Sequence, residues 1–186
     1  INKSKEEITP EMGKITVKNN NKEASWGAVY WQYFEKMDKI TPQETPIVVK
    51  KELYIEKQTE KGPILIKIND SDTIKIGDKI KVRLEISADR EMEFVHLKDT
   101  RAAGFEPGNV ISGYKRQDGL WYYESMKDAS VNFFFDYLPT GNFVFEYELR
   151  GAAAGIYSNG IAEIQCMYAP EFAAHSAGSR VRITDN

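Results

Sequence analysis

SVNFFFDYLPTGNFVFEYELRG, residues 130–151, decides the fold of this chain of 186 residues. Two aromatic runs with period-two alternation flank a Leu-Pro-Thr-Gly segment, and such alternation is typical of half-buried strands. Pro139 fixes the φ angle of a turn and Gly141 tolerates positive φ, so the pattern predicts a long β-hairpin. We expect its two apolar faces to share one core and to hold Val131, Phe133, Phe135 and Tyr137 from the first run and Phe143, Phe145, Tyr147 and Leu149 from the second.

The chain around this segment carries the same strand signature. The cleanest run follows the turn at 76–78, where apolar residues at 80, 82, 84 and 86 alternate with charged residues at 79, 81, 83 and 85. This pattern indicates one buried and one solvated face. Further strands are predicted at 48–57, 64–68, 93–99, 121–125, 161–168 and 179–183. Sequential strands without intervening helices favour an all-β fold, an antiparallel β-sandwich.

The first 46 residues have a different organisation. Strands are predicted at 14–18 and 25–34, and the two could pair as an N-terminal β-hairpin. Two prolines and polar residues at 41–46 then disfavour regular structure. We therefore place a domain boundary there, between an N-terminal segment at 1–46 and a sandwich domain at 47–186.

Composition argues against several classes of partner. The 25 basic and 28 acidic residues are interspersed, with a formal net charge of -3, so no nucleic-acid partner is expected. No run approaches the roughly 20 apolar residues of a membrane span, so direct membrane insertion by this chain is not expected. The N-terminus lacks the apolar core of a signal peptide, and any export signal would lie upstream. The single cysteine, Cys166, is predicted to be a buried structural thiol.

Residues that carry enzyme chemistry do not form a recognisable set. His96 and His175 are isolated from any nucleophile pattern, and Cys166 with His175 is too sparse a set for zinc. Paired carboxylates such as Glu146 and Glu148 fall on the solvated side of strands, and no glycine run forms a phosphate loop. We therefore expect no catalytic residue, no cofactor, no metal and no enzymatic activity.

Two groups of aromatic residues are candidates for recognition. Trp121, Tyr122 and Tyr123 offer flat apolar rings that could stack on sugars, although core packing is the alternative explanation. Phe134 stands alone on the outward face of its run, between two polar residues. If Phe134 is exposed, it marks a surface that meets a neighbouring domain.

Four ordered stretches resemble the C-terminal part of bacterial α-2-macroglobulin-like proteins, most closely those of the Bacteroidetes branch. They are distributed along residues 11–183, and their combination is more specific than any single piece. The stretches are SWGAVYWQYFEKMDKIT at 25–41, EFVHLKDTRAAGFEPGNVISGY at 93–114, NFFFDYLPTGNFVFEYELR at 132–150 and CMYAPEF at 166–172.

The resemblance implies that 47–183 is the final macroglobulin-type β-sandwich, the counterpart of the receptor-binding domain in animal relatives. It implies that 11–40 holds returning strands of a preceding CUB-like domain. In this family a thioester in a Cys-x-x-Gln type motif captures the attacking protease. Here Cys166 is followed by Met-Tyr-Ala, so this chain lacks the motif and its thioester.

The resemblance further implies a non-enzymatic domain of an exported endopeptidase inhibitor, serving interdomain packing or docking. Its partners would be the upstream domains of the same polypeptide and, through the full-length protein, target proteases. The location implied is the periplasm or cell surface, with a lipoprotein-type membrane anchor supplied by an upstream segment. The alternative that the aromatic residues leave open is a carbohydrate-binding or adhesin-like β-sandwich module.

Overall fold

The computed structural model describes residues 9–20, 22–25 and 34–185, and the chain divides into two compact units, Ile1–Phe34 and Glu35–Asn186. In the described part of the first unit, the 3-10 turn η2 (Pro10–Gly13) is followed by residues without strand structure. The strand predicted at 14–18 is therefore wrong for this structure, because no strand among the described residues pairs with it. Most of its predicted partner at 25–34 lies outside the described residues.

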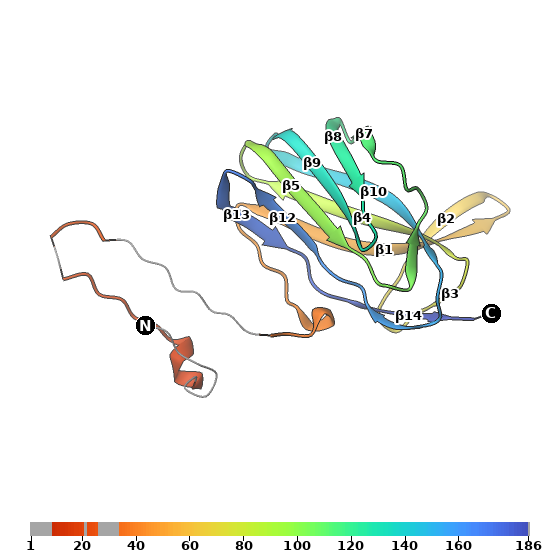
Figure 1. Ribbon diagram of the computed structural model, residues 1–186, viewed down its shortest axis with the longest axis horizontal. Helices are drawn as coiled ribbons and strands as arrows, with labels where there is room; N and C mark the ends of the chain where they lie inside the picture. Colours follow the sequence, from red (N-terminus) through yellow and green to blue (C-terminus); the bar gives the residue numbers. More distant parts are fainter. Residues whose placement is uncertain (1–8, 21, 26–33, 186) are drawn as a thin grey trace. The chain divides into compact units, whose positions relative to one another are not determined.

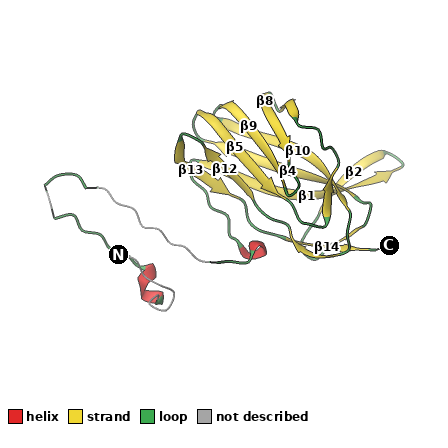
Figure 2. Ribbon diagram, viewed as in Figure 1, coloured by secondary structure: helices red, strands yellow, loops and turns green. Residues whose placement is uncertain are grey.

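The second unit is an antiparallel β-sandwich, as predicted (Figures 1 and 2). No α-helix occurs between residues 34 and 185, where η3 (Met37–Lys39) is a single 3-10 turn. One layer is a five-stranded sheet in the order β2 (Gly62–Lys67), β1 (Ile47–Thr59), β4 (Lys79–Ala88), β10 (Gly141–Gly151) and β6 (Phe105–Pro107). The other is a six-stranded sheet in the order β13 (Ala169–His175), β12 (Ala162–Cys166), β5 (Met92–Thr100), β9 (Ser130–Leu138), β8 (Leu120–Met126) and β7 (Gly113–Gln117).

A small third sheet extends the sandwich at the C-terminus. Its order is β11 (Gly155–Ser158), β14 (Arg180–Thr184) and β3 (Thr73–Lys75). The β14–β3 pair is parallel, whereas β11 runs antiparallel to β14. The strands β3, β6, β7, β11 and β13, which are three to seven residues long, are not among the predicted strands.

The two aromatic runs are both strands, but they do not pair as the predicted hairpin. β9 pairs with β5 and β8 in the six-stranded sheet, whereas β10 pairs with β4 and β6 in the five-stranded sheet. The Leu-Pro-Thr-Gly segment therefore crosses from one layer to the other, with Gly141 at φ +146°. A hairpin and such an arch bury the same alternate residues, so the alternation alone does not distinguish them.

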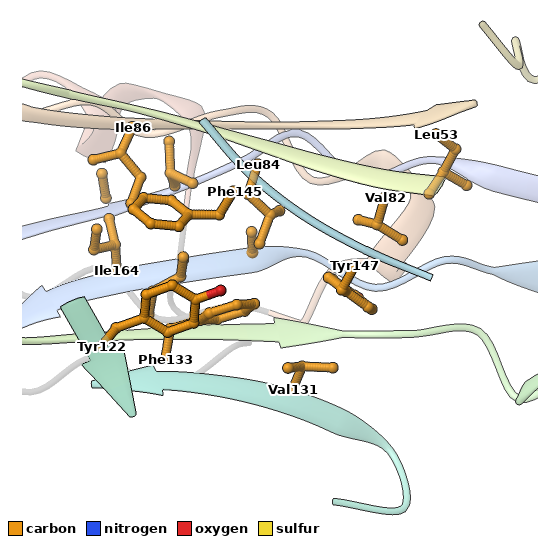
Figure 3. Packing of buried hydrophobic residues seen from close by; sticks show 14 of the residues in the cluster. Leu53, Val82, Leu84, Ile86, Tyr122, Val131, Phe133, Phe145, Tyr147 and Ile164 are labelled. Carbon is orange, nitrogen blue, oxygen red and sulfur yellow. The ribbon is translucent and has the colours of Figure 1, made fainter. Parts of the chain in front are cut away.

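The predicted common core is confirmed, and it lies between the two runs (Figure 3). The ring centroids of Phe135 and Phe145 lie 5.0 Å apart across the layers, and those of Phe133 and Phe145 lie 6.3 Å apart. Tyr122 of β8 packs edge-on against Phe145 at 5.3 Å. These contacts are within the range favoured by aromatic pairs, so the arch holds the two sheets together through rings.

One residue of the predicted core face is wrong. Tyr137 is 46% exposed, and Leu138 is buried in its place. β9 reverses its faces at this point because Asp136 and Tyr137 both turn outward. On the adjacent strand β5, Phe94 adopts φ +55°, so both strands change face at the same level.

The segment predicted as a domain boundary lies against the sandwich. Gln43 forms a two-way backbone bridge with His175 at the end of β13, and the carbonyl of Ile40 accepts from Gly178 at 2.9 Å. The Arg180 guanidinium of β14 contacts the Asp38 carboxylate at 2.5 Å. The domain boundary at residue 46 stays a prediction. The segment before it is held against the sandwich by these contacts.

Candidate functional site: an aromatic sheet face

The outward face of the six-stranded sheet carries a row of rings. Strand register places His96 of β5 beside Phe134 of β9, Phe134 beside Tyr123 of β8, and Tyr123 beside Tyr114 of β7. Directly opposite residues on one face of an antiparallel sheet lie within contact distance. Four strands therefore present one continuous line of aromatic side chains, which we call the aromatic row.

Ring contacts fix the geometry of the aromatic row. His96 and Phe134 stack almost in parallel, with centroids 4.6 Å apart and planes 4° apart. The His96 Nε2 atom lies 2.9 Å from Oδ1 of Asn132, which orients the imidazole over the phenyl ring. Tyr114 and Tyr123 meet edge to face at 5.2 Å. The rings are thus held by their neighbours before any partner binds.

The aromatic row is open to solvent. Phe134 is 36% exposed, Tyr123 is 37% exposed and Tyr114 is 72% exposed. Trp121, two residues before Tyr123 on the same face of β8, is 65% exposed. Neighbouring apolar side chains exposed in this way form a patch of the kind that marks binding surfaces.

The structure divides the aromatic residues that the sequence singled out. Trp121 and Tyr123 join Phe134 on the outward face, so two separate predictions fall on one surface. Tyr122 does not belong to it, because alternation along β8 turns its ring into the core, where it is 1% exposed. Burial raises the pKa of the Tyr122 hydroxyl, which has no hydrogen-bond partner among the described residues.

Two members of the aromatic row were not among the predicted site residues. His96 was interpreted only as an isolated strand residue, and Tyr114 lies on the unpredicted strand β7. An Asp118-Gly119 turn joins β7 to β8, and both residues have positive φ, at 47° and 83°. An Asp-Gly pair between alternating runs is the strongest local hairpin signal, so it could have revealed β7 and Tyr114.

The exposed side chains of the aromatic row are mainly apolar rings. In the part of the chain that the structure describes, no group of three or more His, Cys, Asp or Glu side chains is placed to hold a metal ion. Nor do the described residues include a helix of sufficient length and apolar character to cross a bilayer. Flat rings held by stacking suit contact with another apolar surface or with a sugar ring.

Comparison with known proteins connects this geometry to a family. The family model described as the bacterial alpha-2-macroglobulin MG10 domain matches residues 47–171. A comparison with curated protein sequences finds no match.

Solved structures share the fold at low sequence identity. Salmonella alpha-2-macroglobulin reacted with methylamine is similar with a TM-score of 0.62 and 17% identity, over 78% of this chain and 10% of that one. Escherichia coli alpha-2-macroglobulin activated by porcine elastase gives 0.60 and 15%, over 77% and 14%. The native E. coli protein from domain MG7 to the C-terminus gives 0.58 and 14%, over 76% and 24%. This chain thus spans a quarter or less of each of these solved chains.

Proposed function

Because this chain belongs to the MG10 domain family of bacterial alpha-2-macroglobulins, we propose that it is a non-enzymatic domain of a larger protease trap and that its aromatic row docks on a neighbouring domain. The observation that carries the docking role is the exposed row across β5, β9, β8 and β7. The match to this chain covers only 10% to 24% of the similar solved proteins, so each of them is at least four times longer than the part that matches. A domain of this kind therefore has neighbours within its own polypeptide.

The physical argument for docking rests on the composition of the aromatic row. Tyr, Trp and Phe are enriched at protein interfaces, where they bury large areas with few rotatable bonds. Phe134 has no polar group that gains from contact with water, yet more than a third of it is exposed. Covering Phe134, Tyr123 and Trp121 together would remove this apolar area from water and favour the docked state.

Protease capture itself is proposed to reside upstream. Cys166 is 6% exposed and its thiol donates to the carbonyl oxygen of Glu93 at 3.3 Å, so it is a structural residue of β12. The role left to this domain is packing against, and positioning of, the upstream domains. We further propose an exported protein of the periplasm or cell surface, anchored to the membrane through an upstream segment.

The test uses the full-length protein and an outward substitution that spares the core. A Phe134→Ser, Tyr123→Ser double variant should reduce the fraction of an added protease that the protein withholds from a large protein substrate. The matched control is Ile156→Ser on β11, since Ile156 is 58% exposed but lies in the three-stranded sheet. Equal capture by the double variant, the control and the unaltered protein would rule out docking through the aromatic row.

A second function is favoured by one observation, the 65% exposure of Trp121 next to the Tyr114–Tyr123 pair. A flat ring exposed to this extent could stack on a pyranose as part of a carbohydrate-binding or adhesin-like module. Glycan-array binding by the 186-residue chain that disappears in Trp121→Ala would support this function. An array without binding would leave domain docking as the role of this face.

A further inference from the structure

A lysine and an aspartate meet in the centre of the sandwich, between its two layers. Lys51 comes from β1 of the five-stranded sheet and Asp99 from β5 of the six-stranded sheet. The Nζ atom of Lys51 lies 2.7 Å from Oδ1 of Asp99, and the two side chains are 3% and 0% exposed. Lys51 occupies an inward position of β1 between Val49 and Leu53, so its side chain points toward the opposite layer.

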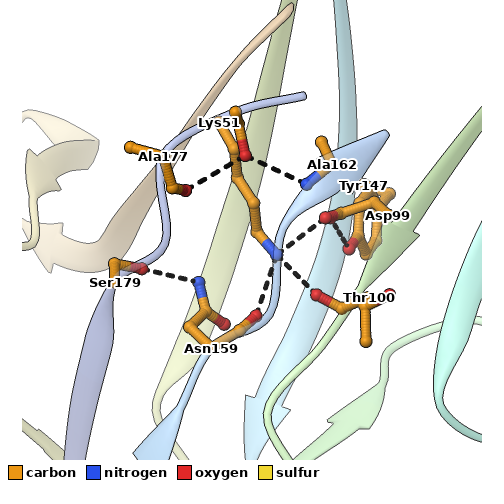
Figure 4. A network of polar contacts seen from close by, with 9 residues as sticks. Lys51, Asp99, Thr100, Tyr147, Asn159, Ala162, Ala177 and Ser179 are labelled. Atoms are coloured by element: carbon orange, nitrogen blue, oxygen red, sulfur yellow. Dashed lines mark hydrogen bonds and ion pairs between the residues drawn. The ribbon is translucent and has the colours of Figure 1, made fainter. Parts of the chain in front are cut away.

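The surroundings of the pair hold both groups in place (Figure 4). Lys51 Nζ donates to the carbonyl oxygens of Thr100 at 2.7 Å and Asn159 at 3.1 Å. The Tyr147 hydroxyl donates to Oδ2 of Asp99 at 2.5 Å. Oδ1 of Asp99 contacts the ammonium group but has no aligned hydrogen bond. The amine and the carboxyl group are therefore in contact, and one carboxyl oxygen is polarised by a separate donor.

We propose that Lys51 and Asp99 condense to form an isopeptide bond, which links the two sheets covalently. The site is a modification site made entirely from side chains of this chain. It is independent of docking by the aromatic row, because every participating atom lies in the core.

Burial favours the neutral form of the Asp99 carboxyl, which such a reaction needs. Desolvation raises the pKa of the Asp99 carboxyl, while the ammonium group of Lys51 and the hydroxyl of Tyr147 oppose this rise. A proton can pass from Nζ to Oδ1 across their 2.7 Å contact, leaving an amine and a carboxylic acid. This contact holds the nitrogen next to the carboxyl group that it is to attack, as a near-attack arrangement requires.

The reaction balances without an added reactant. The lone pair of Nζ attacks Cγ of Asp99 and forms a C–N bond, and the negative charge develops on Oδ2. Tyr147 stabilises that charge by its hydrogen bond, in the manner of an oxyanion-hole donor. Burial and the adjacent Asp99 raise the pKa of Tyr147 well above its usual range, so it stays a donor. The Cγ–Oδ1 bond then breaks, and Oδ1 leaves as water with a second proton from Nζ.

The product removes two costs that the unreacted pair carries. A buried ion pair loses the solvation of both charges, and a buried oxygen without an aligned donor adds a further cost. In the amide, Oδ2 continues to accept from Tyr147, and the single N–H can donate to the carbonyl oxygen of Thr100 or Asn159. The new bond also closes a chain loop and so restricts the unfolded state.

Intact mass spectrometry of the denatured 186-residue chain tests the proposal. We expect a mass lower than the sequence mass by one water molecule, and a peptide from β1 joined to a peptide from β5 after digestion. Lys51→Arg should restore the full mass, because the guanidinium group is a poor nucleophile. Tyr147→Phe should lower the reacted fraction at a given time by roughly tenfold or more, as expected for loss of one such donor.

The Lys115–Glu124 pair is the matched control. Its side chains also meet at 2.5 Å, but Lys115 is 32% exposed, so its amine is accessible to water. Lys115→Arg should therefore keep the deficit of one water. A folded, unaltered chain that retains the full sequence mass after long incubation would overturn the proposal, and so would a deficit that persists in Lys51→Arg.

Discussion

The outward faces of the two large sheets follow the same alternation but have opposite chemistry. On the five-stranded sheet, Arg83 and Lys81 of β4 contact Glu146 of β10 at 2.7 and 3.6 Å. Beside them the Tyr54 hydroxyl donates to the Glu52 carboxylate at 2.6 Å. The Arg83 guanidinium lies over the ring of Tyr54, with its Cζ atom 4.8 Å from the ring centroid. These charges are paired within the sheet, and the pairs remain in contact with water. We call this outward side of the five-stranded sheet the charged face.

The six-stranded sheet instead presents the aromatic row. Its rings contact one another, but Tyr114 remains 72% exposed, and its neighbours on the row do not cover it. Alternation decides which side chains point outward. The chemistry of those side chains decides whether the face is well solvated by water or leaves apolar area exposed. The comparison therefore separates a solvent face from the face that we propose for docking, within one sandwich.

The largest effect on stability is expected from a substitution in the core between the two sheets. There Phe145 is 0% exposed and contacts rings from the opposite layer. Phe145→Ala should lower the free energy of unfolding by about 3–5 kcal/mol, because it removes buried area and leaves a cavity. Chemical denaturation monitored by circular dichroism measures the loss. Tyr122→Phe is the control, since it removes only an unpartnered hydroxyl and should change stability by less than about 1 kcal/mol. Similar losses in both variants would contradict this account of the core.

The aromatic row should contribute less to the stability of the chain itself. Phe134→Thr keeps a good strand residue but removes the stack on His96, so we expect a loss of about 0.5–1.5 kcal/mol. The loss should not change with salt concentration, because no charge pair is removed. Denaturation at low and high sodium chloride tests this. A loss as large as that of Phe145→Ala would show that the aromatic row is a core element and would end its distinction from the interior.

The sequence alone predicts the strands and their buried sides more fully than their partners. Ile80, Val82, Leu84 and Ile86 of β4 are all 1% exposed or less, as their alternation with charged residues predicts. Alternation is a local property, so it identifies the inward side of each strand. Which sheet a strand joins depends on distant residues, and this is why the arch between β9 and β10 was predicted as a hairpin.

The candidate site was predictable only in part for the same reason. Phe134 stands out within its own run, and Trp121 and Tyr123 stand out in theirs. Their meeting on one surface depends on the pairing of β8 with β9, which places Tyr123 opposite Phe134. The Lys51–Asp99 contact gave no sequence signal either, because its two residues are far apart in the chain and belong to different layers.

The charged face should respond to salt where the aromatic row does not. A double-mutant cycle with Arg83→Met and Glu146→Gln is expected to give a coupling free energy of about 0.3–1 kcal/mol, since the pair is partly solvated. High salt should reduce the coupling by screening. The matched cycle on Tyr114 and Tyr123 should keep its coupling at the same salt concentrations. Equal salt dependence of the two cycles would remove the distinction between the faces.

The smallest effect is expected from acid titration of the charged face. Hydrogen bonds from Lys67 and Tyr54 hold the pKa of Glu52 below its ordinary value. A lowered folded-state pKa means that Glu52 contributes stability above its unfolded pKa of about 4.3, and that this contribution is lost as pH falls through the folded value. Glu52→Gln should therefore be less stable than the unaltered chain by about 0.2–1 kcal/mol near neutral pH, and the two should converge in acid.

Denaturant midpoints measured across the acid range test this convergence, with Glu60→Gln as the control. Glu60 is an exposed residue of the turn between β1 and β2, so its replacement removes a carboxylate outside the Glu52–Lys67–Tyr54 contacts. If the denaturant midpoints of Glu52→Gln and the unaltered chain still differ at the most acidic pH, Glu52 acts through packing rather than charge. The charged face would then resemble the aromatic row, in which packing of the side chains fixes the geometry.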